Sequence, residues 1–144
     1  MTFVFDAENE VHARALARLE SEQVGWLVTS GRDGYPHAVP IWFLWHEGRA
    51  LIFSEPKTAK VANIRADEKV ALHLEAGVDG EQLTVLRGLA TLHDGAGPAW
   101  VEKIGQAYTA KYDAWLQRLN LTTATMLDRY TTVIEVEPHK LLAW

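Results

Sequence analysis

The amino-acid sequence predicts a mainly β fold with flanking helices, in which a six-stranded antiparallel sheet curls into a barrel. Six segments have the composition and alternation of strands, and short turns rich in glycine, proline and aspartate join most of them. Parallel strands would need a long crossover connection between each pair, so short turns favour an antiparallel sheet. We find no internal repeat, low-complexity stretch or linker, and we therefore expect one domain over residues 1–144.

The first half of the chain predicts one helix and three strands. Residues 7–23 place apolar side chains at helical spacing, with charged residues on the opposite face. The strands predicted after this helix are residues 24–30, 37–45 and 50–54. Pro40 lies inside the second of them. Because proline cannot donate a hydrogen bond to a neighbouring strand, we expect this position at an edge, a bulge or a mouth of the sheet.

The second half predicts three more strands, separated by helices. A short helix is expected over residues 58–67, followed by strands at 70–75 and 82–93. Pro98 is well placed to open a longer helix that continues to about residue 119 and buries one apolar and aromatic stripe. A short helical segment at 123–130 and a strand at 132–137 complete the predicted elements.

Composition and charge exclude several classes of function. The chain has 144 residues, a net charge of −5 and no cysteine. Without cysteine there is no disulfide, no thiolate metal site and no cysteine nucleophile. The negative net charge and the lack of a basic stripe argue against a nucleic-acid partner. The histidines do not have the spacing of a metal-binding pair, so we assign no metal site.

The N-terminal residues and the hydropathy predict a cytoplasmic protein. Residues 1–6 lack the basic segment and the long apolar stretch of a secretory signal peptide. No apolar run approaches the ~20 residues that a membrane-spanning helix needs. We therefore expect a cytoplasmic location and no membrane partner.

The most informative segment begins where the third predicted strand ends, at Ser54. Lys57, Thr58 and Lys60 follow it around the first turn of a predicted helix. A helix N-terminus carries about half a positive charge, so cations at that end are normally unfavourable. They become favourable if an anion such as a phosphate binds among the lysines, the hydroxyl groups and the free backbone N–H groups. The alternative is that Lys57 and Lys60 are solvated lysines on a surface helix.

Several segments, in this order and spacing, resemble a known family. They are the Trp-Leu-Val-Thr-Ser run at 26–30, residues 33–43, Ile-Phe-Ser at 52–54, Lys-Thr-Ala-Lys-Val-Ala-Asn-Ile at 57–64 and the closing residues 136–144. Together they resemble the pyridoxamine-phosphate-oxidase-like split β-barrel proteins, and within them the branch of F420-dependent enzymes. The resemblance covers most of the chain.

The resemblance implies a homodimer with a flavin-type cofactor in grooves at the subunit interface. It implies that Ser54, Lys57, Thr58 and Lys60 hold the cofactor phosphate, in agreement with the anion argument from the helix start. It also implies that Asn63 contributes to the site and that backbone from the second strand lines the tricyclic ring. The backbone positions concerned are Val39, Pro40, Ile41 and Trp42.

The predicted function is that of an F420-dependent oxidoreductase, which transfers a hydride between the deazaflavin and a small organic substrate. Such chemistry needs a positioned ring rather than a protein nucleophile, and the sequence contains no Ser-His-Asp triad signature, P-loop or Gly-rich dinucleotide loop. We assign no catalytic residue. Two alternatives stay open: an FMN-dependent oxidase or reductase of the same fold, and a cofactor-binding, storage or haem-binding protein without turnover. A haem would need an axial ligand, for which His37 and His93 are the candidates.

Overall fold

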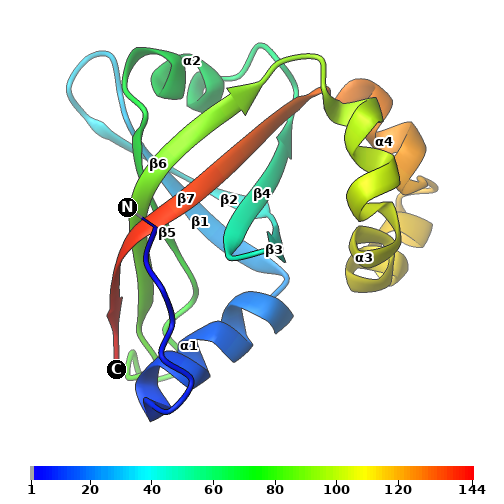
Figure 1. Cartoon of the computed structure of the whole chain (residues 1–144). Coiled ribbons are helices and arrows are strands. Elements are labelled where there is room, and N and C mark those ends of the chain that lie inside the picture. Colours follow the sequence, from blue (N-terminus) through cyan, green and yellow to red (C-terminus); the bar gives the residue numbers. More distant parts are fainter. Residues whose placement is uncertain (1) are drawn as a thin grey trace.

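The chain folds into a seven-stranded antiparallel sheet that curls into an open barrel (Figure 1). This computed structural model describes residues 2–144, so Met1 of the predicted domain lies outside the described part. The strands follow the spatial order β2-β1-β5-β6-β7-β4-β3. Their bounds are β1 Val24–Ser30, β2 Pro36–Trp42, β3 Leu44–His46, β4 Arg49–Ser54, β5 Lys69–His73, β6 Thr84–His93 and β7 Thr132–Ala143. The helices are α1 Glu10–Ser21, α2 Ala59–Ala66, α3 Gly97–Arg118 and α4 Thr123–Arg129.

The predicted mainly β barrel with flanking helices is confirmed, but one predicted strand is divided. The segment 37–45 forms β2 and β3, which are separated at Phe43 and lie at opposite edges of the sheet. Pro40 lies in β2, an edge strand that pairs with β1 alone, as the missing proline N–H predicts. The chain therefore crosses the opening of the barrel at Phe43.

The last strand is longer than predicted, since β7 continues past residue 137 to Ala143. Pro138 lies inside β7 and has no backbone N–H to donate to the neighbouring strand. The pairing of β7 with β6 shifts register at this point, between Arg87 and Gly88 of β6. A Cβ on Gly88 would lie 2.0 Å from the carbonyl oxygen of Glu137. The glycine thus allows the two backbones to approach each other at this β-bulge.

Side chains alternate between two cores, one on each face of the sheet. In β4, Ala50 and Ile52 point into the barrel, whereas Leu51 and Phe53 point outward beneath α3 and α4. The barrel core also contains Leu27, Leu72, Leu86, Ile134 and Val136. The outer core contains Val133, Ile104, Tyr108, Tyr112, Leu116, Met126 and Leu127.

The helices occupy three different sides of the barrel (Figure 1). Helix α1 lies below one end and begins at Glu10 rather than at residue 7, because the side chain of Asn9 accepts hydrogen bonds from two backbone N–H groups and caps the helix. Helix α2 closes the opposite end and contributes Val61 and Ile64 to the barrel core. Helices α3 and α4 pack together outside β4 and β7.

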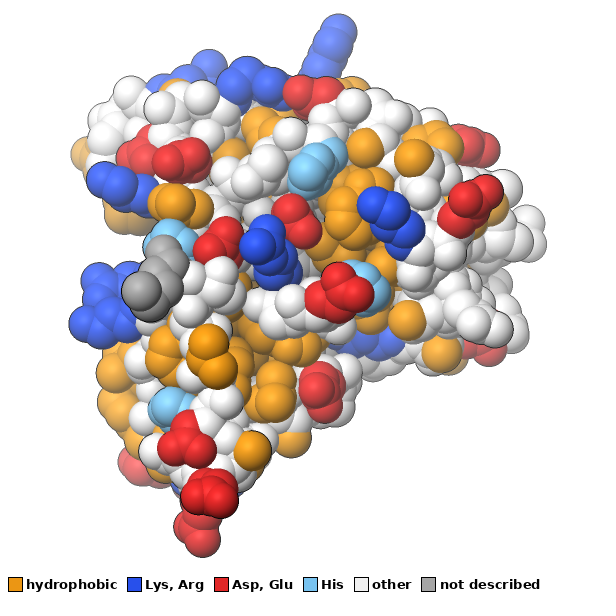
Figure 2. Space-filling model, in the orientation of Figure 1, with side chains coloured by type: hydrophobic (Ala, Val, Ile, Leu, Met, Phe, Trp, Pro, Cys, Tyr) orange, Lys and Arg blue, Asp and Glu red, His pale blue; other side chains and the backbone are white. Residues whose placement is uncertain are grey.

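Charged side chains of both signs are interspersed over the face shown in Figure 2, with apolar side chains between them. That face carries no continuous basic stripe of the kind that binds nucleic acid. Among the helices described, none combines the length and the apolarity of a membrane-spanning segment.

Candidate functional site

The predicted anion site lies where β4 ends and α2 begins. Thr58 caps α2 and its Oγ1 accepts a hydrogen bond from the backbone N–H of Val61 at 3.4 Å. The same oxygen lies 3.1 Å from Oγ of Ser54, which in turn donates to the carbonyl oxygen of Glu55 at 2.8 Å. These bonds fix the turn that carries the exposed Lys57 and leads to the partly buried Lys60.

Lys60 is the cation of this segment that folding removes furthest from water. Burial lowers the pKa of its ammonium group, and the nearby carboxylate of Glu55 partly opposes this effect. Glu55 itself pairs with Arg129, whose Nε lies 2.9 Å from its Oε1. None of the ion pairs between residues 2 and 144 involves Lys57 or Lys60. An anionic ligand would therefore find a cation that the protein has not already paired.

Lys60 also lines a pocket of about 290 Å³ at the end of β2. Pro40, Ile41 and Trp42 form the β2 side of this pocket. Two predicted parts of the site, which are about twenty residues apart in sequence, thus meet around one cavity. The remaining lining residues are apolar or aromatic: Phe53, Leu119, Leu121, Met126 and Tyr130.

The other predicted site residues lie around this pocket rather than in its lining. Ser54, Lys57 and Thr58 surround the start of α2. The side chain of Val39 is partly buried and packs against the barrel core. Asn63 is buried, and its Nδ2 donates to Oγ1 of Thr29 at 3.0 Å. This bond fastens α2 to β1 and leaves the predicted ligand role of Asn63 without a contact that supports it.

Sequence reasoning missed the wall that α3 and α4 contribute. Leu119 and Leu121 come from the connection between these helices, and Met126 and Tyr130 come from α4 and its C-terminal end. The sequence carried no signal for this wall beyond two leucines on either side of Asn120 at the end of a predicted helix, and only the structure shows that Leu119 stays 56% exposed. Asn120 between the two leucines has a positive φ of 57°, which gives this connection its tight turn.

Trp42 forms a flat aromatic wall held by α3. Its ring stacks on Tyr112 with the ring centroids 4.7 Å apart and the planes 6° from parallel. Trp115 packs at a tilt against both rings, at 5.2 Å from Trp42 and 5.8 Å from Tyr112. A side chain fixed in this way offers a planar ligand a preformed apolar surface.

The candidate haem ligands do not face this pocket. His37 lies in β2 opposite Thr29, and its Nδ1 is buried without a hydrogen-bond partner in the described part of the chain. His93 lies in β6, where its Nε2 is 3.2 Å from Oε1 of Glu135. Within residues 2–144 no group of three or more histidine, aspartate or glutamate side chains is arranged to hold a metal ion.

Comparison with known protein families shows which family the chain belongs to. The family model described as pyridoxamine 5'-phosphate oxidase matches residues 11–144. The chain belongs to this family. Both the barrel and the pocket thus lie in the part of the chain that matches the pyridoxamine 5'-phosphate oxidase family.

Solved structures of other proteins share the fold of this family member at low sequence identity. A structure described as an F420 reductase is 23% identical, covers 88% of this chain and 94% of its own, and superposes with a TM-score of 0.68. A conserved hypothetical protein from Mycobacterium tuberculosis is 20% identical, with coverages of 100% and 89% and a TM-score of 0.76. A FAD-binding protein from Mesorhizobium loti is 15% identical, with both coverages 90% and a TM-score of 0.61. Comparison with curated proteins gave no significant match.

Proposed function

We propose that this protein is an F420-dependent oxidoreductase, which binds the deazaflavin and transfers a hydride between it and a small organic substrate in the cytoplasm. One observation carries the proposal. Lys60, which is partly buried and forms no ion pair within residues 2–144, lines the same pocket as the flat apolar end of β2. The F420 reductase that shares the fold supports the choice of cofactor.

The chain's own residues fit a cofactor that combines a flat ring with a phosphate. Ser54, Lys57, Thr58 and Lys60 would hold the phosphate at the start of α2, where the helix dipole also favours an anion. The backbone from Val39 to Trp42 would line the ring, with the pocket giving it a volume of about 290 Å³. The bound deazaflavin supplies the hydride chemistry, and the apolar lining excludes water from the ring.

We further propose that the protein is a homodimer whose interface adjoins the pocket. Among residues 2–144, helices α3 and α4 cover the outside of β4 and of the first part of β7, whereas no helix covers the outer face of β2, β1, β5, β6 and the last part of β7 (Figure 1). One row of cross-strand neighbours on this face is mostly apolar and ends at the pocket residue Pro40. The row consists of Pro40, Trp26, His73, Val85 and Leu142. A second copy seated there would lie beside the pocket and bury these side chains.

FMN is the competing cofactor, because the chain belongs to the pyridoxamine 5'-phosphate oxidase family and shares its fold with a FAD-binding protein, so that a flavin is the natural alternative to the deazaflavin. The test is a parallel fluorescence titration of cofactor-free protein with F420 and with FMN. Tight binding of F420 and weak binding of FMN is the expected result. The reverse would identify an FMN-dependent enzyme, and binding of neither, with uptake of haem, would overturn the proposal.

The phosphate assignment has its own test in the double substitution Lys57→Ala with Lys60→Ala. Charge-assisted hydrogen bonds are worth ~1.5–3 kcal/mol each, so we expect the loss of both lysines to weaken F420 binding by a few kcal/mol, on the order of a hundredfold or more. The matched control is Lys103→Ala, which removes an exposed lysine from α3, away from the pocket. Equal affinities in the double variant and the control would refute the assignment.

A further inference from the structure

The chain crosses from one edge of the sheet to the other at Phe43, immediately after the pocket residue Trp42. At such a crossing the backbone leaves the ladder, and its polar groups need other partners because Phe43 is fully buried. Helix α3 supplies them. The N–H of Phe43 donates to Oη of Tyr112 at 2.9 Å, and Nζ of Lys111 donates to the carbonyl oxygen of Phe43 at 2.5 Å.

Tyr112 connects this crossing to two further parts of the molecule. Its hydroxyl lies 2.6 Å from the carbonyl oxygen of Gln23, just before β1, and 2.9 Å from that of Phe43. Because Lys111 already donates to the Phe43 oxygen, the shorter bond to Gln23 is the natural destination of the Tyr112 hydrogen. The ring of Tyr112 stacks on Trp42 at the same time. One side chain therefore fixes both the backbone and the aromatic ring at the end of β2.

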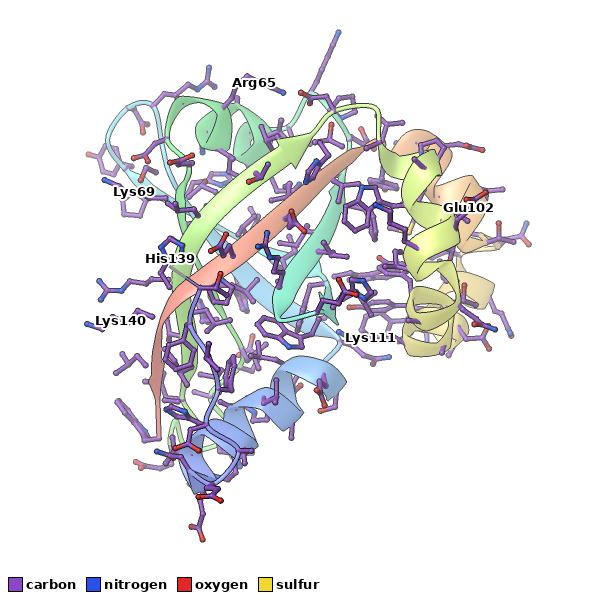
Figure 3. The ribbon with its side chains drawn as sticks, in the orientation of Figure 1. Arg65, Lys69, Glu102, Lys111, His139 and Lys140 are labelled. Carbon is purple, nitrogen blue, oxygen red and sulfur yellow. The ribbon has the colours of Figure 1, made fainter. Side chains whose placement is uncertain are left out.

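Lys111 reinforces the same crossing. Its Nζ lies 3.8 Å above the centroid of the Phe43 ring, and its own carbonyl oxygen accepts a hydrogen bond from Nε2 of Gln23 at 3.0 Å. Figure 3 shows Lys111 between α3 and the barrel. The crossing is thus held by a hydroxyl, an ammonium group and a stacked ring, all from one turn of one helix.

Tyr108 differs from Tyr112 in the hydrogen bonding of its hydroxyl group. It lies one turn before Tyr112 on the same helix, is equally buried, and packs edge-on against Phe53 with the centroids 5.0 Å apart. Its hydroxyl has no hydrogen-bond partner in the described part of the chain. The two tyrosines therefore share burial and ring packing, and only Tyr112 bonds to the strand end that lines the pocket.

We propose that Tyr112 is a positioning residue for the ligand pocket, acting through the Phe43 backbone and the Trp42 ring. The inference rests on the proposed function, since it assigns to Tyr112 the task of presenting the end of β2 to the ring of the cofactor. Loss of its hydroxyl leaves the buried N–H of Phe43 without an acceptor and frees the strand end to move. Tyr112 touches no ligand itself in this assignment.

The experiment compares Tyr112→Phe with Tyr108→Phe, which removes the same atom without removing a hydrogen bond. Two quantities are measured: the dissociation constants for F420 and FMN, and the hydrogen-exchange rate of the Phe43 amide, with amides of β6 as the reference for global opening. In Tyr112→Phe we expect about tenfold weaker cofactor binding and at least about tenfold faster exchange at Phe43. In Tyr108→Phe both should stay within about twofold of the wild type.

The two measurements, cofactor binding and Phe43 exchange, distinguish a failure of this inference from a failure of the proposed function. Wild-type protein that binds a cofactor, together with unchanged binding and exchange in Tyr112→Phe, overturns the positioning role and leaves the function standing. Wild-type protein that binds neither cofactor overturns the function, and the exchange rates alone then decide whether Tyr112 holds the strand end. If Tyr112→Phe does not fold, the wild type decides: a Phe43 amide protected as strongly as the β6 amides supports the inference, and exchange at the rate of an unbonded amide contradicts it.

Discussion

Lys60 and Lys111 are both withdrawn from water by folding, but their surroundings give them different tasks. Lys60 lines a pocket open to a ligand, whereas Lys111 is already bound to the backbone of Phe43 and to its ring. Burial lowers the pKa of Lys60 and lowers that of Lys111 from 10.5 to about 8. The first lysine is available for binding, and the second is a structural cation whose protonation is linked to stability.

The lowered pKa of Lys111 predicts an unusual gain of stability in alkaline solution. Between pH 8 and 10.5 the unfolded chain binds a proton that the folded protein has released, so the free energy of unfolding rises with pH. The gain attributable to Lys111 should be roughly 2 kcal/mol, less than the full pKa shift would give because solvent partly screens the group. Burial raises the pKa of Tyr108 and Tyr112 in the folded protein. Above about pH 10 the unfolded chain therefore loses tyrosine protons that the folded protein keeps, and the free energy of unfolding falls as the pH rises further.

Urea unfolding at pH 7.5, 8.5 and 9.5 measures this linkage, and Lys111→Met is the matched variant because it keeps the aliphatic stem over Phe43. The wild type should gain stability across this range relative to the variant. Parallel pH profiles for the two proteins would show that Lys111 does not carry the effect.

At the scale of elements, α3 and α4 act as one unit that completes both the outer core and the pocket. Helix α4 begins with a capping box between Thr122 and Thr125, and Oγ1 of Thr123 in its first turn lies 2.6 Å from Oγ1 of Thr109 in α3. The N-terminal end of α3 meets the C-terminal end of α4 at Gly97, whose N–H donates to the carbonyl oxygen of Thr131 at 3.0 Å. Because the pocket wall comes from the connection between these helices and from α4 with its C-terminal end, their mutual packing sets its shape.

Two glycines of α3 should respond in opposite ways to alanine. A Cβ on Gly97 would lie 2.6 Å from the carbonyl oxygen of Leu127 and 2.9 Å from that of Tyr130, so Gly97→Ala should destabilise the protein by roughly 2–3 kcal/mol. In mid-helix, a Cβ on Gly105 would meet only Cγ1 of Val101 at 3.3 Å. Gly105→Ala should therefore stabilise by roughly 0.5–1 kcal/mol. Urea unfolding of both variants checks this, and a loss of stability of similar size in the two would contradict it.

At the scale of the whole molecule, the sheet leaves one outer face bare. Helices α3 and α4 cover the outside of β4 and β7, while the labelled Lys69 and Lys140 in Figure 3 project from the sheet on the side away from α3. Leu142, two residues after Lys140 on the same face of β7, is 52% exposed. An apolar row with charged neighbours is typical of a surface that is covered by another protein.

The proposed homodimer can be tested on this face. Light scattering at micromolar concentration should give the mass of two chains for the wild type. Leu142→Arg places a charge in the apolar row and should shift the protein towards the monomer, since burying an unpaired charge is costly. Val78→Arg changes an exposed residue in the turn between β5 and β6 and should leave the dimer intact. A monomeric wild type would contradict the assignment.

Local sequence patterns predicted most of the elements because turns and periodicity are local properties. The turn residues between 31 and 36 separate β1 from β2, and Pro40 correctly marks an edge strand. The break at Phe43 was not predictable in this way. The apolar run around it is continuous in sequence, and the groups that take its backbone out of the ladder, Tyr112 and Lys111, lie about seventy residues further along.

The sequence by itself determined the antiparallel barrel, the edge position of β2 and the cationic start of α2, since each depends on neighbouring residues and on periods of a few residues. Only the tertiary structure decided that Lys60 meets Trp42 in one pocket, that Leu121 and Tyr130 form its far wall, and that Asn63 bonds to Thr29 instead of lining it. These contacts join segments that are distant along the chain. They arise because side chains pack to fill the space between elements, and no local pattern encodes that complementarity.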